Sequence, residues 1–242
     1  MSFDLLVAVA AVVAGAIAAV TGFGIGSLLT PVFALAFGTR LAVAVVAIPH
    51  LAGTLLRFVT LRRHVDRRML LGFGVTSALG GLAGALLHTR ASGRALAIVF
   101  GALLALAGVS ELTGWVRRVH WGRRAAWVAG ALSGALGGLV GNQGGIRSAA
   151  MLGFDVPRQS FVATATAVAL FVDGARLPVY AALEGRAMVD AWRPIAIASA
   201  GVVTGTLLGT RLLARLPERA FRRVVAVVLL ALAVWMLVRG GR

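Results

Sequence analysis

Residues 5–37, LLVAVAAVVAGAIAAVTGFGIGSLLTPVFALAF, decide the fold. The stretch has no charged side chain and is longer than the roughly 20 residues that an α-helix needs to cross a bilayer. Glycines at positions 22, 24 and 26, and then Pro31, interrupt it. Since glycine and proline both weaken a helix, we expect a membrane helix that breaks within the apolar layer, at the glycines and at Pro31.

Seven further apolar segments follow, at residues 41–58, 69–87, 95–114, 125–154, 161–183, 191–213 and 221–238. The chain is 60% apolar and 13% charged, with a mean hydropathy of +0.93. A soluble domain keeps about a quarter of its residues charged. The sequence therefore predicts an all-α, polytopic helical membrane protein without a sizeable soluble domain. Met1–Asp4 carries an acidic residue and no arginine, so we expect the first segment to be a span rather than a removable signal.

Arginine supplies all the basic charge, and it gathers in short intervals between the apolar segments. The main clusters are Arg62, Arg63, Arg67 and Arg68; Arg117, Arg118, Arg123 and Arg124; and Arg215, Arg219, Arg222 and Arg223. Such loops are typical of the cytoplasmic face, where they meet anionic lipid headgroups. The net charge of +16 therefore indicates a membrane surface and not a nucleic acid. The absence of cysteine excludes disulfides and thiolate metal sites.

The order of segments repeats. The offset that carries Gly22 to Gly141 also carries Gly26 to Gly145 and Arg57 to Arg176. We therefore predict two four-segment repeats, residues 1–119 and 120–242, within one membrane unit, each opening with a glycine-broken segment. In transporters built this way, the broken helices meet near the midplane and form the binding site.

Two topologies fit the repeats. If each broken segment crosses once, the halves are parallel. If each is a hairpin that enters and returns, the halves are inverted and both termini lie outside the cytoplasm. The second arrangement separates the arginines more sharply between the two faces, and we favour it slightly.

The stretch at residues 141–148, GNQGGIRS, holds the strongest candidate site. Asn142, Gln143 and Arg147 are polar groups inside an apolar run, and Gly144 and Gly145 let the helix open. A helix that restarts there presents free N–H groups to an anion, and a guanidinium suits oxyanions. We predict an anion site from these five residues, with Gly22, Gly24 and Gly26 as the opposing wall. A buried polar network that joins two helices is the alternative.

Other polar residues in the spans are candidates for a cavity or for ion coupling. Arg57 and Arg176 either take part in the site or extend to the interface. Asp173 lies three residues before Arg176, so the two are expected to pair, although Asp173 could instead carry protons. Thr164 could line the same cavity, and His50, beside Pro49, could bind substrate, titrate or pack on a polar neighbour.

The broken segments resemble those of the sulfite exporter TauE/SafE family, also called the four-toluene-sulfonate uptake permease family. The resemblance rests on residues 21–26 with Pro31, on residues 138–150, and on the closing pattern of residues 205–212 with Leu216-Pro217. It covers nearly the whole chain and implies secondary transport of a sulfur oxyanion or organosulfonate in a bacterial inner membrane. Asn142-Gln143 interrupts the family's more regular glycine run, and Ala150 replaces a proline, so the resemblance does not fix sulfite as the substrate.

These observations favour a multipass transporter of a small anion. The sequence has no HExxH, Gly-x-Ser-x-Gly or phosphate-cradling motif, so we expect neither an enzyme nor a cofactor or metal. An anion channel and a membrane scaffold without substrate remain the alternatives. Small-residue faces such as Gly80-Gly81-x-x-Gly84 could pack helices within the chain or in a homo-oligomer.

Overall fold

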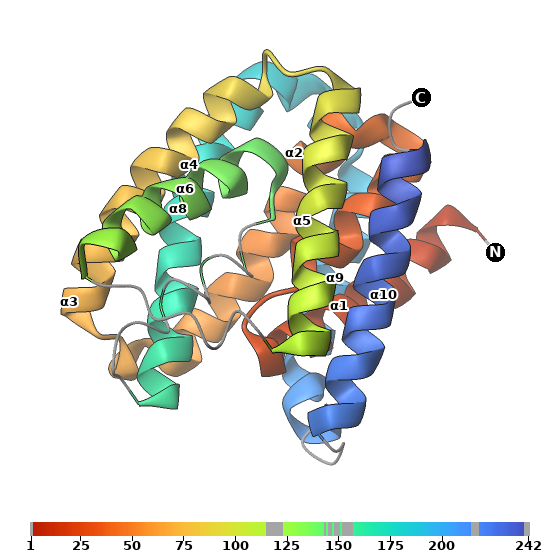
Figure 1. Ribbon diagram of the computed structural model, residues 1–242. Coiled ribbons are helices and arrows are strands. Elements are labelled where there is room, and N and C mark those ends of the chain that lie inside the picture. Colours follow the sequence, from red (N-terminus) through yellow and green to blue (C-terminus); the bar gives the residue numbers. More distant parts are fainter. Residues whose placement is uncertain are drawn as a thin grey trace.

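The computed structural model describes residues 2–114, 123–142, 144, 147, 151, 157–213 and 218–239, and it is helical as predicted (Figure 1). The main helices are α1 (Phe3–Thr21), α2 (Ile25–Leu61), α4 (Val75–His88), α5 (Gly93–Thr113), α6 (Arg123–Val140), α8 (Arg158–Asp190), α9 (Trp192–Leu213) and α10 (Glu218–Arg239). A short 3₁₀ turn, η1 (Arg62–His64), and two further turns, α3 (Arg67–Met69) and the π-helical η2 (Leu70–Gly74), join α2 to α4. Within the described residues, five helical stretches are long and apolar enough to span a membrane: Phe3–Thr21, Ile25–His64, Arg67–His88, Gly93–Thr113 and Gln159–Asp190. The protein is therefore a multipass helical membrane protein.

The predicted break at the first glycine motif is confirmed. Helix α1 ends at Gly22, which has φ 81°, and the N–H of Gly22 donates to the carbonyl of Ala18 at 2.9 Å. Gly24 has φ 122°, and α2 begins at Ile25. Both glycines adopt backbone conformations that a side chain would disfavour, so the glycines are what end one helix and allow the next to start.

The predicted interruption at Pro31 is wrong. Residues 25–37 are helical through Pro31, and the chain departs from helical geometry at Gly38 instead, with φ 71° and ψ 162°. Proline removes one backbone hydrogen bond, but its fixed φ is compatible with a helix. The positive φ of Gly38 is not, so the sharp change of direction falls there.

The first broken segment is a hairpin. The ring of Phe3, at the start of α1, lies 6.1 Å from the ring of Phe33 and 5.9 Å from that of Phe37. Residues 25–37 therefore return alongside α1 to the side of the membrane from which α1 started. After Gly38 the chain crosses to the other side.

The second broken segment returns as well, on the opposite side. Met151, beyond the second break, packs in one buried cluster with Ala129 near the start of α6 and with Met69. Helix α8 then runs antiparallel to the second part of α2, because Arg40 pairs with Glu184 at one end and the N–H of Asp66 donates to Thr164 at the other. The two halves are therefore inverted, as the hairpin alternative predicts.

Helices from the two halves pack in pairs. Helix α1 packs on α9 and α4 on α6, while α2 packs on α8 and α5 on α10. Figure 1 shows α5 and α10 side by side along one flank, with α4 and α6 on the opposite flank. The repeat matches α1 with α6, α2 with α8, α4 with α9 and α5 with α10. Exchanging the halves therefore turns the α1–α9 pair into the α6–α4 pair, and it maps the α2–α8 and α5–α10 pairs onto themselves. The helix pairs thus follow a two-fold pattern, and the repeat bounds 1–119 and 120–242 stay a prediction.

Glycines let two of these pairs approach at backbone distance. A Cβ on Gly134 of α6 would overlap the carbonyl oxygen of Ser77 on α4, and one on Gly205 of α9 would overlap that of Val12 on α1. Small residues at four-residue spacing are typical of membrane helix interfaces. Leu79, Val128 and Val227, by contrast, are 65%, 62% and 61% exposed, as expected of side chains that contact lipid.

We predict that Gly134→Ala destabilises the protein, because the added methyl group meets the Ser77 backbone and the two helices must separate. Overpacking of this kind costs on the order of 1–3 kcal/mol. Gly185→Ala in α8 is the matched control, since a Cβ there meets nothing within 4 Å. Thermal unfolding in detergent should show a lower Tm for the first variant only. An equal Tm for both would contradict the close α4–α6 contact.

The inverted topology predicts a labelling pattern that single cysteines can test, because the chain has none of its own. Ser2, Ser92 and His64 are exposed. In intact cells, we expect a membrane-impermeant maleimide to label Ser2→Cys and Ser92→Cys, and His64→Cys only after permeabilisation. A single crossing by the first segment would instead place positions 2 and 64 on the same side.

Candidate functional site

The two breaks face each other, as predicted. A Cβ on Gly26 would overlap the carbonyl oxygen of Gly141, and one on Gly144 would collide with Phe23. Across the same contact, the hydroxyl of Ser27 donates to Oδ1 of Asn142 at 3.2 Å. Gly141 has φ 72°, close to the 81° of Gly22, so both helices end in the same way. Gln143 and Gly145, which we also predicted to line the site, lie outside the described residues.

Arg57 and Arg176 cap the ends of the two broken helices. Nη1 of Arg57 donates to the carbonyl of Ala18 at 2.6 Å, and Nη1 of Arg176 donates to that of Gly137 at 3.0 Å. Ala18 and Gly137 stand at the same repeat offset as the two arginines. The guanidinium groups do not extend to the interface, since Arg57 is only 5% and Arg176 only 2% exposed. Each carbonyl also accepts the N–H of the glycine that ends its helix, Gly22 or Gly141, so the guanidinium is a second donor at the negative end of the helix dipole.

Asp173 is held from two sides. Its Oδ1 accepts from Nε of Arg176 at 3.0 Å and lies 2.8 Å from Nη2 of the same residue, which confirms the predicted pair. Its Oδ2 lies 2.7 Å from Nδ1 of His50 on α2. Among the carboxylates that the structure describes, Asp173 alone is buried. His50 therefore contacts a polar neighbour, and this contact is compatible with a titrating histidine.

Arg147 is buried, and no carboxylate among the described residues pairs with it. It is 2% exposed, and its Nη2 lies 3.5 Å from the carbonyl of Gly22, at the long end of a hydrogen bond. Its Nε and Nη1 have no acceptor among the described residues, and neither do Nε of Arg57 and Nδ2 of Asn142. These three residues all contact the segment from Ala18 to Ser27. Buried donors without acceptors are uncommon in proteins, so their gathering at one break makes this the candidate anion site.

Tyr180 and His88 belong to the same network, and sequence reasoning missed both. The hydroxyl of Tyr180 donates to the carbonyl of Gly138, and Nδ1 of His88 lies 2.7 Å from the carbonyl oxygen of Leu139. The two rings are 5.0 Å apart, and the guanidinium of Arg176 lies 5.9 Å from the Tyr180 ring centre. Tyr180 is the single tyrosine of the chain and lies four residues after Arg176, which was a usable signal. His88 carries no such signal.

Thr164 lies away from this network. Its hydroxyl accepts from the N–H of Asp66 at 2.9 Å, at the end of α8 that faces η1 and α3. Asp173 follows nine residues later, which places the two side chains more than 10 Å apart along the helix axis. The structure therefore gives Thr164 a place at a helix junction rather than beside Asp173.

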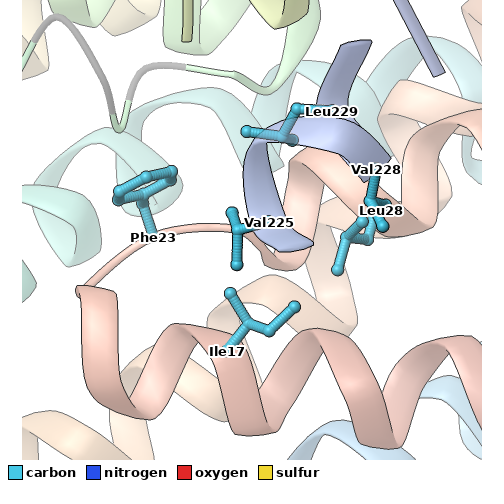
Figure 2. A pocket seen from close by; sticks show the side chains of 7 residues that line it. Ile17, Phe23, Leu28, Val225, Val228 and Leu229 are labelled. Carbon is cyan, nitrogen blue, oxygen red and sulfur yellow. The ribbon is translucent and has the colours of Figure 1, made fainter. Parts of the chain in front are cut away.

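An apolar pocket lies on the side of the first break that faces α10. Figure 2 shows Ile17, Phe23 and Leu28 of the break beside Val225, Val228 and Leu229 of α10. Gly24 completes the lining, and no side chain in it can donate to an anion. The candidates for binding an anion are therefore the buried donors and not the residues of this pocket.

A comparison with known families bears on the whole chain. Residues 7–236 match the family model described as sulfite exporter TauE/SafE. No curated protein and no solved structure matches the chain.

We predict that Arg176→Met lowers stability far more than Arg40→Met. The first variant leaves Asp173 buried with only His50 as a partner, and breaking a buried pair costs about 3–5 kcal/mol. The second removes a surface pair whose arginine side chain is 45% exposed, which is worth about 0–1 kcal/mol. Thermal unfolding of the purified variants would measure both. Equal losses would show that the buried pair does not hold α8 in place.

Proposed function

The chain belongs to the sulfite exporter TauE/SafE family of membrane transport proteins, and we propose that it is a secondary transporter whose anion site lies between the two broken helices. The substrate class is a sulfur oxyanion or an organosulfonate. Arg147 holds the anion, with Asn142 and Arg57 beside it, and the backbone at Gly22–Gly26 forms the opposing wall.

The observation that carries the proposal is the excess of buried positive charge. Arg57, Arg147 and Arg176 are buried together with a single described carboxylate, Asp173, which pairs with Arg176. A charge at membrane depth is costly unless it is paired. An anion between Arg57 and Arg147 would offset that cost, and the planar guanidinium can donate two parallel hydrogen bonds to an oxyanion.

The start of α2 adds backbone donors to the same place. Its first N–H groups, from Ile25 onward, have no earlier turn to bond to, and they carry the positive end of the helix dipole. Ser27 in this turn contacts Asn142 of the other half. Because the donors come from both breaks, movement of one break relative to the other would assemble or open the site.

Burial favours a carrier over a channel. His50, Asn142, Arg147 and Asp173 are each less than 9% exposed, so an anion can reach them only after the helices move. A channel would need a path open to both sides at once. A scaffold without substrate would leave Arg147, which has no carboxylate partner among the described residues, without an explanation.

We expect purified protein in liposomes to exchange one or more of sulfite, sulfate, thiosulfate and an alkylsulfonate, with saturation kinetics. Arg147→Ala should reduce this flux at least tenfold, because loss of a charged hydrogen bond costs roughly 1.5–3 kcal/mol. Arg94→Ala removes an exposed arginine and serves as the control with wild-type flux.

Three results would contradict the proposal in different ways. Unaltered flux in Arg147→Ala would move the site elsewhere. Flux that never saturates would favour the channel. No flux of any of the four anions, with the protein folded and inserted, together with a partner protein that co-purifies, would favour the scaffold.

A further inference from the structure

We propose that the His50–Asp173 pair binds the coupling proton, and that the proton and the anion cross the membrane together. This inference rests on the proposed function and adds the coupling ion to it. It starts from the one contact in which a titratable group of α2 meets a buried carboxylate of α8.

The hydrogen bonds fix where the proton can bind. Asp173 faces Arg176 with Oδ1 and His50 with Oδ2, so it is held as a carboxylate that only accepts. Nδ1 of His50 must then donate, and the neutral ring carries its free lone pair on Nε2. A proton that arrives binds Nε2 of His50 and leaves the Asp173 contact in place. The side chain of His50 is 11% exposed and that of Asp173 is 0% exposed, so His50 is the member of the pair that a proton can reach.

The charges around His50 link the proton to the anion. Asp173 and Arg176 face it from α8, and Arg57 faces it from its own helix. The other elements that pack on α2 carry their described charges near their ends: Asp4 on α1, Arg94 and Glu111 on α5, Arg193 on α9, Arg222 and Arg223 on α10, and Arg62, Arg63 and His64 on η1. Near His50, therefore, positive charge exceeds negative charge. A positive charge on the ring is unfavourable there until an anion binds at Arg57 and Arg147.

Linkage then sets the sign of the coupling. Because a bound anion makes protonation of His50 more favourable, a bound proton must make anion binding more favourable by the same factor. The two ligands therefore favour the same loaded state, which is the requirement for symport. An exchange of anion for proton would need the opposite sign.

The first half of the chain offers an internal comparison. The repeat offset that carries Arg57 to Arg176 carries Thr54 to Asp173. Nη2 of Arg57 lies 3.4 Å from the hydroxyl of Thr54, where Arg176 has a carboxylate. Threonine does not titrate near neutral pH. The titratable pair therefore occurs once, between His50 of the first half and Asp173 of the second, and a single proton per cycle is expected.

The test separates anion exchange from proton-driven accumulation. Wild-type protein in liposomes is given the anion that it exchanges, as a monoanion, with the membrane potential held at zero by potassium and valinomycin. At equal pH on both sides, we expect exchange without accumulation. With the outside one pH unit more acidic, coupling to one proton drives accumulation of roughly tenfold.

His50→Gln is the deciding variant, because the amide can still donate to Asp173 but does not titrate. We expect measurable exchange at equal pH and no accumulation in the pH gradient. Asp173→Asn should lose accumulation too, although it also removes the partner of Arg176. Glu184→Gln is the control, a carboxylate of the same helix at its exposed end, and it should accumulate the anion as the wild type does.

Each contrary outcome points to a different error. Wild-type exchange without any response to the pH gradient would overturn the inference and leave the proposed function intact. Full accumulation by His50→Gln would also overturn the inference and leave the proposed function intact. Loss of exchange as well as accumulation in folded His50→Gln would make His50 part of the anion site and not a proton site. No exchange by the wild type would overturn the proposed function and this inference together.

Discussion

The ends of two helices that stop inside the membrane impose the main constraint on this structure. Their last carbonyls have no following turn to accept from, and no bulk water surrounds them. Arg57 donates to such a helix end at Ala18, and Arg176 does so at Gly137, and each of these carbonyls also accepts the N–H of the glycine that ends its helix. The two guanidinium groups therefore stabilise the partial negative charge at the ends of the broken helices. This role accounts for two buried arginines in a protein that is 60% apolar, and for their recurrence at the offset of the broken helices.

The halves differ in what surrounds these arginines, and the difference creates the candidate site. Arg176 has Asp173 where Arg57 has Thr54. Arg147 stands where the first half has Leu28, and Asn142 stands where it has Phe23. A symmetric pair of capped helices would need only structural arginines. In the second half, Asp173 adds a negative charge that Arg176 matches, and Arg147 adds a positive charge that no described carboxylate matches. This imbalance is what the proposed anion would offset.

Local patterns in the sequence were enough to predict the spans, both glycine breaks and the Asp173–Arg176 pair. Each of these depends on residues close together in the chain. Pro31 misled the prediction because a helix tolerates proline at the expense of one hydrogen bond, while Gly38 carries the change of direction. The contact of His50 with Asp173 and that of His88 with Tyr180 join distant helices, so no spacing in the sequence reveals them. They follow only from the antiparallel packing of α8 on α2 and from the position of α4 beside it.

The packing shows which parts can move as units. Helix α1 of the first half packs at backbone distance on α9 of the second, and α6 of the second packs in the same way on α4 of the first. Each close pair therefore joins the two proposed repeats, so a boundary at residue 119 is not a plane along which the protein could open. Between these pairs lie α2 and α8, whose contact combines apolar side chains with the polar pair of His50 and Asp173. A polar contact can exchange partners at lower cost than interlocked backbones can separate. We therefore expect the α2–α8 contact to be where the molecule responds to an anion or a proton.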